Sequence, residues 1–138
     1  MKIAPSAAFA LFILLAEAAT AQVHQAPARS VVDAQKAELS TAEFKKAMES
    51  GDYQLIDVRT PAEFASGRIA GAVNIDWTAD GFEKAFAAIK RDKPVLLYCL
   101  GGGRSEQALE HLVGLGYRAQ HLEGGISAWR KAGHPVVK

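Results

Sequence analysis

Short apolar segments alternate with helix-forming segments from Ser40 to Lys131, and this alternation limits the possible folds more than any other feature of the chain. The strands that it predicts are Tyr53–Val58, Val73–Ile75, Val95–Tyr98 and Arg118–Leu122. Strands this short and apolar are typical of a parallel sheet that is buried on both faces. Because parallel strands are usually connected by helices, the alternation predicts an α/β domain with helices on both faces of the sheet.

Capping signals mark the start of two predicted helices. Ser40 precedes Glu43 by three residues and Thr60 precedes Glu63 by three, which is the spacing of a capping box. Pro61 stands at the first helical position of the second helix, where a missing N–H is tolerated. The helical spacing of apolar residues predicts three further helices, over 82–89, 105–113 and 126–131. The first predicted element of regular structure therefore begins at Ser40.

The N-terminal segment has the pattern of a secretory signal peptide. Lys2 precedes an apolar run over 7–16, and the Ala-Thr-Ala sequence at 19–21 is a small-x-small cleavage pattern. The run is shorter than the roughly 20 residues of a spanning helix, which favours cleavage over the alternative of an uncleaved anchor. We expect an exported protein with no stable membrane anchor after cleavage, periplasmic in a Gram-negative bacterium. The expected parts are a signal peptide over 1–21, a flexible lead-in over 22–36 and one folded domain over 37–138.

The charge balance argues against nucleic acid as the main partner. Lys and Arg number 16 against 15 for Asp and Glu, so the formal net charge is +1 and no strong field surrounds the chain. The histidines of the folded part, His111, His121 and His134, are scattered without metal-ligand spacing, and a core or surface role is expected for each. Neither a metal nor a cofactor is therefore expected.

Cys99 is the only cysteine of the chain. Because it has no second cysteine as a partner, Cys99 cannot form an internal disulfide. Exported domains normally use cysteines in pairs, and an unpaired one is at risk of oxidation. A chemical role would explain its presence, whereas the alternative is a buried cysteine that acts as a small hydrophobic residue.

The segment after the most apolar predicted strand has the features of a nucleophile loop. Cys99 ends the strand, and Leu100, three glycines and Arg104 separate it from the next predicted helix at Ser105. Glycines let successive amides turn inward, and these amides together with the helix N-terminus favour a thiolate. The alternative is a tight turn with a packed cysteine and a solvated arginine. A nucleotide site is excluded because the Lys-Ser/Thr of a Walker loop and the G-x-G-x-x-G pattern are both absent.

Four segments of the chain resemble signatures of the rhodanese family. The loop 99–105 reads CLGGGRS and is similar to the family's C-x-x-G-x-R-S form. Segments 55–64 (LIDVRTPAEF) and 66–75 (SGRIAGAVNI) resemble its upstream signature, and 122–129 (LEGGISAW) resembles its C-terminal one. The matched segments follow the order of the family's signatures along the chain, and together they extend over nearly all of the predicted domain.

The resemblance implies a doubly wound α/β domain with a central, mostly parallel sheet flanked by helices on both faces. It implies that Cys99 is the nucleophile and carries a persulfide, while amides from Leu100 to Arg104 stabilise the sulfur and Arg104 assists donor binding. The substrate-binding residues that it implies are Leu100, Gly101, Gly102, Gly103, Arg104 and Ser105.

The resemblance also implies a supporting shell. Asp57 and Arg59 are expected to organise the site as an ion pair rather than to react. Glu63 is expected to cap its helix, and Trp129 to fill the core. Arg68 is assigned to the supporting shell as well, although it stands where the family often has histidine and so raises the local charge.

The reaction that the resemblance implies is sulfur transfer. A Cys99 thiolate would take the sulfane sulfur of a small-molecule donor such as thiosulfate and hold it as a persulfide. A thiophilic acceptor would then remove it, either cyanide in an assay or an external thiol or protein in the cell. Because the chain has no second cysteine, the acceptor must come from outside. The uncharged Leu100 and Gly101 leave the identity of the donor open.

Three rival functions remain as alternatives. A cysteine phosphatase needs the wider C-x-x-x-x-x-R loop, whereas only four residues separate Cys99 from Arg104 here. A non-catalytic module that binds sulfur or a partner commonly lacks the cysteine that this chain keeps. A thiol redox protein would need the second cysteine of a C-x-x-C motif.

Overall fold

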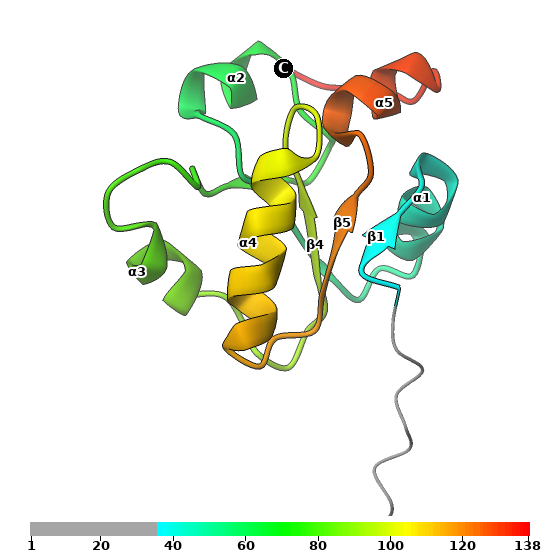
Figure 1. Cartoon of the computed structure of the whole chain (residues 1–138). Coiled ribbons are helices and arrows are strands. Elements are labelled where there is room, and N and C mark those ends of the chain that lie inside the picture. The colour runs from blue at the N-terminus through cyan, green and yellow to red at the C-terminus, as the bar shows by residue number, and fades with distance from the viewer. Residues whose placement is uncertain (1–35) are drawn as a thin grey trace, which may run out of the picture. The chain divides into compact units, whose positions relative to one another are not determined.

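A five-stranded parallel sheet organises residues 36–138, the part of the chain that the computed structural model describes (Figure 1). The strands are β1 (Glu38–Leu39), β2 (Gln54–Asp57), β3 (Val73–Asn74), β4 (Val95–Tyr98) and β5 (Ala119–Leu122). The helices are α1 (Thr41–Glu49), α2 (Pro61–Ser66), α3 (Phe82–Ala87), α4 (Gly103–Gly114) and α5 (Gly125–Lys131). The strand order is β1-β5-β4-β2-β3, and each adjacent pair is parallel.

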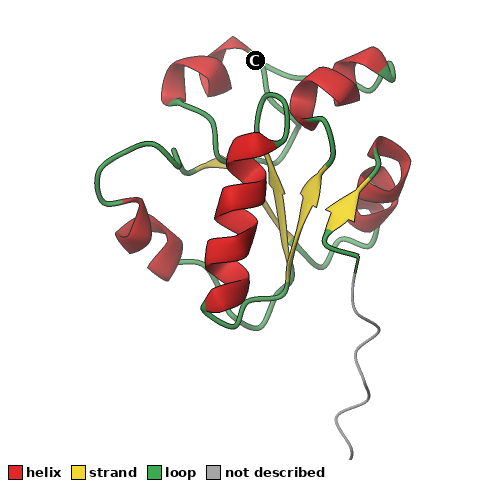
Figure 2. Cartoon of the chain, in the orientation of Figure 1, coloured by secondary structure: helices red, strands yellow, loops and turns green. Residues whose placement is uncertain are grey.

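Two apolar cores lie on opposite faces of the sheet, as the alternation of strands and helices predicts. On one face, Phe86 of α3 and Leu112 of α4 pack against Leu97 of β4. On the other, Phe44 of α1 and Trp129 of α5 belong to the second core. Figure 2 shows α4 crossing in front of the strands. The predicted α/β fold with helices on both faces is confirmed.

The order of the strands explains which helix covers which face. The chain crosses from β1 to β2 through α1 and returns from β3 to β4 to β5 through α3 and α4. Right-handed crossovers that run in opposite directions place their helices on opposite faces. β4 therefore lies at the centre, and its carboxyl end opens between the ends of β2 and β5.

Both predicted capping boxes are present. Ser40 Oγ accepts the Glu43 amide N–H at 3.3 Å, and the Glu43 carboxylate accepts the Ser40 N–H at 2.8 Å. Thr60 and Glu63 make the same two bonds at 3.3 and 3.0 Å. Gly51 follows α1 with a φ of 74°, a left-handed conformation that favours glycine.

Among the boundaries that differ from the sequence expectations are the start of regular structure and the start of α4. Regular structure begins with β1, ahead of Ser40, because β5 pairs with it: the His121 N–H donates to the Ala37 carbonyl and the Glu123 N–H to the Leu39 carbonyl, both at 2.9 Å. A two-residue strand that is held by a partner far along the chain leaves no local pattern. Helix α4 also begins at Gly103, two residues before the predicted start.

The expected signal peptide over 1–21 and most of the lead-in lie outside the described residues. Only Lys36 of the lead-in is described, and its Nζ lies 2.9 Å from the Glu43 carboxylate. Between Lys36 and Lys138, no helix is long and apolar enough to cross a membrane.

Candidate functional site

The sulfur of Cys99 lies at the carboxyl end of β4, beneath the loop that leads into α4. The residue is 1% exposed, and the Gly102 N–H donates to Sγ at 3.0 Å. Gly102 has a φ of 109°, a conformation that L side chains rarely adopt, and this lets its amide turn back to the sulfur. Only Gly102 of the three loop glycines has a positive φ. The turn that was expected of three successive glycines is therefore made at Gly102, whose amide reaches the sulfur.

Two opposing effects act on the Cys99 thiol. Burial raises its pKa, because a thiolate is poorly solvated in the interior. Hydrogen bonds from the Ser105 hydroxyl and from the amides of Ser105, Gly102 and Arg104 lower the pKa, and together they outweigh burial. The net pKa of Cys99 is below its ordinary value, so the loop favours the thiolate, which is the nucleophilic form.

This environment predicts how alkylation of Cys99 depends on pH. The rate with iodoacetamide should rise with a midpoint lower in the folded protein than in the same protein unfolded in urea, because only the folded loop donates to the sulfur. The measurement is the rate of mass gain across a pH series in the two states. A folded midpoint at or above the unfolded one would contradict the assignment of these donors.

The other loop residues surround the sulfur unevenly. Leu100 is 43% exposed, and Gly101 and Gly103 are also exposed. Arg104 is half-buried, and Ser105 is fully buried with its Oγ 3.0 Å from the Gly102 carbonyl oxygen. The loop thus presents backbone and one leucine to the outside, with no free cationic side chain.

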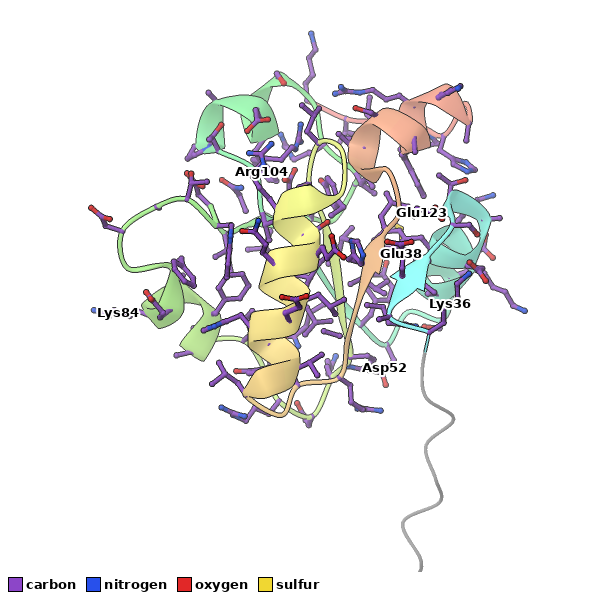
Figure 3. All side chains as sticks on the ribbon, viewed as in Figure 1. Lys36, Glu38, Asp52, Lys84, Arg104 and Glu123 are labelled. Carbon is purple, nitrogen blue, oxygen red and sulfur yellow. The ribbon has the colours of Figure 1, made fainter. Side chains whose placement is uncertain are left out.

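Arg104 is held by a carboxylate rather than left free. Its two terminal nitrogens donate to the two oxygens of Glu63, each at 2.8 Å. Glu63 also belongs to the capping box of α2, so the pair joins the start of α2 to the start of α4; Figure 3 shows Arg104 at that end of α4. The cap was predicted from sequence, but the pair was not, because its members are 41 residues apart.

The Glu63 and Arg104 pair predicts an acid-sensitive contribution to stability. The Arg104 guanidinium is the main cause that lowers the pKa of Glu63 to about 2; partial burial opposes it and Thr60 adds hydrogen bonds. Because the folded pKa is below the unfolded one, the contribution is present above about pH 4.5 and is lost as the pH falls toward 2. For a pair that is partly open to solvent, we expect about 1 kcal/mol.

The test is the substitution Glu63→Gln. At pH 7 its free energy of unfolding in urea should be lower than that of the unmodified chain by about 1 kcal/mol, and at pH 3 the difference should shrink. Glu83→Gln on α3 is the control, because Glu83 is exposed and should show a negligible difference at both values. An equal difference at pH 7 and pH 3 would disprove the ionic contribution.

Asp57 and Arg59 form a buried ion pair at the end of β2, as expected. Arg59 Nη2 lies 2.6 Å from Asp57 Oδ2, and the two side chains are 1% and 0% exposed. The same guanidinium donates to the Gly67 carbonyl at 2.8 Å. The pair therefore holds the chain that links α2 to β3, next to the strand that carries Cys99.

Arg68 points elsewhere than expected. Its guanidinium lies over the ring of Phe64, 4.7 Å from the centroid. Its backbone N–H and carbonyl pair with Val137 at 2.8 Å each. Its contacts are thus with α2 and the C-terminal segment rather than with the loop.

The start of α5 clamps the loop from the other side, a contact that sequence analysis missed. The Ile126 N–H donates to the Cys99 carbonyl at 2.9 Å, and the Ser127 N–H donates to the Leu100 carbonyl at 3.1 Å. A methyl group on Gly125 would lie 2.5 Å from both of these carbonyl oxygens. Two consecutive glycines, Gly124 and Gly125, before a predicted helix were the signal for such a close approach.

One hollow in the described part of the chain does not have Cys99 in its lining. It has a volume of about 580 Å³, and its lining includes Gln54 and Leu55 of β2 and Ile89 after α3. None of residues 99–105 lines it. The described residues contain no group of three or more His, Cys, Asp or Glu side chains placed to hold a metal ion.

Comparison with known proteins matches this arrangement. A sequence model of the rhodanese-like domain matches residues 40–132. A protein named sulfurtransferase from Allochromatium vinosum is 37% identical over 94 residues, which are 67% of this chain and 86% of that protein. A rhodanese-related protein from Thermoplasma volcanium is 33% identical, with a TM-score of 0.66 over 72% of this chain and 96% of that one. A tRNA uridine(34) hydroxylase from Staphylococcus aureus is 37% identical over 98 residues, but the match covers only 31% of the hydroxylase.

Proposed function

The chain belongs to the rhodanese-like domain family, and from that premise we propose that it is a sulfurtransferase that carries sulfane sulfur as a persulfide on Cys99. The observation that carries the proposal is the ring of donors around one buried sulfur. The Gly102 N–H lies 3.0 Å from Sγ, and donors from Arg104 and Ser105 also lower the pKa of the thiol. Such a ring stabilises an anionic sulfur, both as the thiolate and as the persulfide.

The proposed reaction has two steps. The Cys99 thiolate attacks the sulfane sulfur of a donor such as thiosulfate; a new sulfur–sulfur bond forms, and the bond to the sulfite group breaks with its electron pair on sulfite. A thiophilic acceptor, such as cyanide, a thiol or a protein thiolate, then attacks the outer sulfur and releases the Cys99 thiolate. Sulfite leaves as an anion, so the first step needs no general acid. No cofactor takes part.

Backbone amides are the main anion-binding groups in this proposal. Leu100 and Gly101 are uncharged, and the guanidinium of Arg104 is already paired with Glu63. Amides fixed by the fold need no reorganisation when charge develops at the sulfur. Arg104 assists by holding the amino-terminal end of α4 in place, while the supporting role of Asp57 and Arg59 is to hold the neighbouring chain.

The test is the intact mass of the purified protein after incubation with thiosulfate. We expect the addition of one sulfur atom, its removal by cyanide with formation of thiocyanate, and no addition in the Cys99→Ser variant. A second series with an organic persulfide as donor covers the case of a different natural donor. A chain that takes up no sulfur from either donor is a non-catalytic module, and the proposal is then wrong.

We also propose that the chain is exported, on the support of its N-terminal sequence. When the full chain is made in a Gram-negative host, the periplasmic fraction should contain a protein that begins at Gln22. A chain that lacks residues 1–21 is the control and should remain in the cytoplasm. Full-length protein in the membrane fraction would contradict cleavage.

A further inference from the structure

The pair of Glu63 and Arg104 lies at the carboxyl ends of β2 and β4. The Glu63 carboxylate accepts the Thr60 N–H at 3.0 Å, and Thr60 is two residues beyond Val58. The Val58 N–H donates to the carbonyl of the residue before Cys99 at 2.9 Å, so this end of β2 runs alongside the end of β4. Arg104 donates to both oxygens of Glu63, each at 2.8 Å. The pair therefore bridges the segments that follow these two strands, at the edge of the sheet where Cys99 lies.

The position of Arg104 brings its charge near the sulfur. The Gly102 N–H lies 3.0 Å from Cys99 Sγ, and Arg104 follows Gly102 by two residues. Consecutive Cα atoms are about 3.8 Å apart, so the backbone of Arg104 lies within about 11 Å of the sulfur. The pKa of Arg104 is raised above its ordinary value, chiefly by the hydrogen bonds to Glu63 and in part by the charge of the Cys99 sulfur, while burial opposes both. A molecule that approaches the sulfur therefore passes within the field of this side chain.

Glu63 leaves the loop without a net positive charge. Arg104 is the only cationic side chain of residues 99–105, and Leu100 and Gly101 are uncharged. The pKa of Glu63 is lowered to about 2, chiefly by the hydrogen bond from Arg104, so its carboxylate is ionised at neutral pH and balances the guanidinium. An approaching donor therefore meets backbone amides, an exposed leucine and a neutral ion pair.

The neighbouring charges stay the same when this pair is changed. Asp57 and Arg59 form their own buried pair, with Arg59 Nη2 2.6 Å from Asp57 Oδ2. Arg68 lies over the ring of Phe64, 4.7 Å from the centroid, and remains a cation beside α2. Because these residues are common to every variant described below, differences between variants report the charge of the Glu63 and Arg104 pair.

We propose that Glu63 is a specificity-determining residue: by balancing Arg104, it removes the attraction of the site for doubly charged sulfur donors. A dianion such as thiosulfate gains little from a neutral pair, whereas a donor with one charge or none loses little. The donor class that this arrangement favours is sulfane sulfur of low charge, such as an organic persulfide. This choice of donor rests on the proposed function, while the effect of Glu63 on the charge near Cys99 stands without it.

The step with such a donor is balanced. The Cys99 thiolate attacks the outer sulfur of the persulfide, and a new sulfur–sulfur bond forms. The bond between the two sulfur atoms of the donor breaks with its electron pair on the organic thiolate. The outer sulfur keeps its hydrogen, so no oxidant, reductant or general acid is required.

Two alkylating reagents of similar size measure the charge near Cys99 without any sulfur transfer. Iodoacetate has one negative charge and iodoacetamide has none, and both react with the same thiolate, so the ratio of their rates is independent of the pKa of the thiol. At an ionic strength of about 10 mM, Glu63→Gln should raise the ratio of the iodoacetate rate to the iodoacetamide rate about two- to threefold, the scale of one charge at roughly 8–10 Å in water. Arg104→Met should lower the ratio by a similar factor.

The double variant Glu63→Gln/Arg104→Met separates charge from structure. It removes both members of the pair, so its ratio should return to that of the unmodified chain. At about 1 M salt, where the Debye length is about 3 Å, the differences between all variants should disappear. A loosened loop would instead change the rates of both reagents together and would not respond to salt.

Glu43 supplies the matched control. It is also the glutamate of a capping box, and its carboxylate is bound to a cation, Lys36 Nζ at 2.9 Å. Helix α1 packs into the core on the face of the sheet opposite the core that contains Cys99. Glu43→Gln removes the same charge and the same kind of cap, and it should change the ratio much less than Glu63→Gln does. Urea unfolding of each variant establishes that it is folded before its rates are read.

The choice of donor has its own measurement. Sulfur uptake is followed by intact mass, with thiosulfate and with the persulfide of an uncharged thiol, at an ionic strength of about 10 mM. Glu63→Gln should raise the rate with thiosulfate relative to the rate with the persulfide at least about twofold, because thiosulfate has two charges and the persulfide at most one. A relative rate that Glu63→Gln leaves unchanged would overturn the choice of donor.

Two results would overturn the role of Glu63. One is an alkylation ratio that is the same in the unmodified chain and in folded Glu63→Gln at low ionic strength, and the other is an equal change of the ratio in Glu43→Gln. Failure of the proposed function looks different: the alkylation ratios shift as described, but the unmodified chain takes up no sulfur from either donor.

Discussion

The substitution Arg59→Met is expected to lower the free energy of unfolding by about 3–5 kcal/mol, the usual cost of removing one partner of a buried ion pair. Asp57 would remain 0% exposed without the guanidinium that donates to both of its oxygens, at 2.6 to 3.1 Å. The Gly67 carbonyl would also lose its donor. Urea unfolding at pH 7, followed by circular dichroism, measures the effect.

Two further variants separate the buried charge from the loss of packing. The double variant Asp57→Leu/Arg59→Met removes both charges and should recover more than half of the lost stability, because apolar pairs often replace buried ion pairs at little cost. Arg91→Met is the surface control; its guanidinium lies over Tyr117, 4.6 Å from the centroid, and we expect a loss below about 1 kcal/mol. If Arg59→Met alone is as stable as the unmodified chain, the structural role of the Asp57 and Arg59 pair is contradicted.

The substitution Gly125→Ala is expected to slow sulfur uptake by Cys99 about 100-fold, the scale of a displacement of about 1 Å at a reacting centre. The added methyl group would lie 2.5 Å from the carbonyl oxygens of Cys99 and Leu100, and both are backbone atoms that cannot turn aside. The loop or the start of α5 must move, so the hydrogen bonds from Ile126 and Ser127 are lost. We expect a stability loss of about 2–4 kcal/mol from overlap and backbone strain.

A matched glycine separates these two causes. Gly133 has a φ of +79° against +60° for Gly125, but a methyl group there would meet nothing within 4 Å. Gly133→Ala should therefore show the backbone cost alone, about 1–2 kcal/mol, with unchanged sulfur uptake. If the two variants take up sulfur equally fast, the clamp of α5 on the loop does not position the cysteine.

Local patterns in the sequence were enough for most of the fold. The capping boxes at Ser40 and Thr60 predict helices that the structure contains, because a cap depends on residues only three positions apart. The apolar run Val95–Tyr98 is likewise the observed β4, since a strand buried on both faces needs nothing but apolar side chains.

Contacts between distant parts of the chain account for what the sequence could not predict. Glu63 carries a visible capping signal, yet its bond to Arg104 depends on how α2 and α4 are placed by the sheet. His121 and Glu38 are separated by most of the chain and meet only because β1 pairs with β5. The position of the cysteine at a strand end and the action of loop amides on its sulfur were predictable, but the contacts of α5 with the loop were not.

The depth of the cysteine decides which molecules can bond to it. A disulfide between two copies requires their Cα atoms to approach to roughly 4.4–6.8 Å. With Cys99 at 1% exposure, beneath its own loop and the first turn of α5, a second folded chain cannot come that close. Covalent dimers should therefore not form in air while the fold is intact, although the thiol of Cys99 is unpaired.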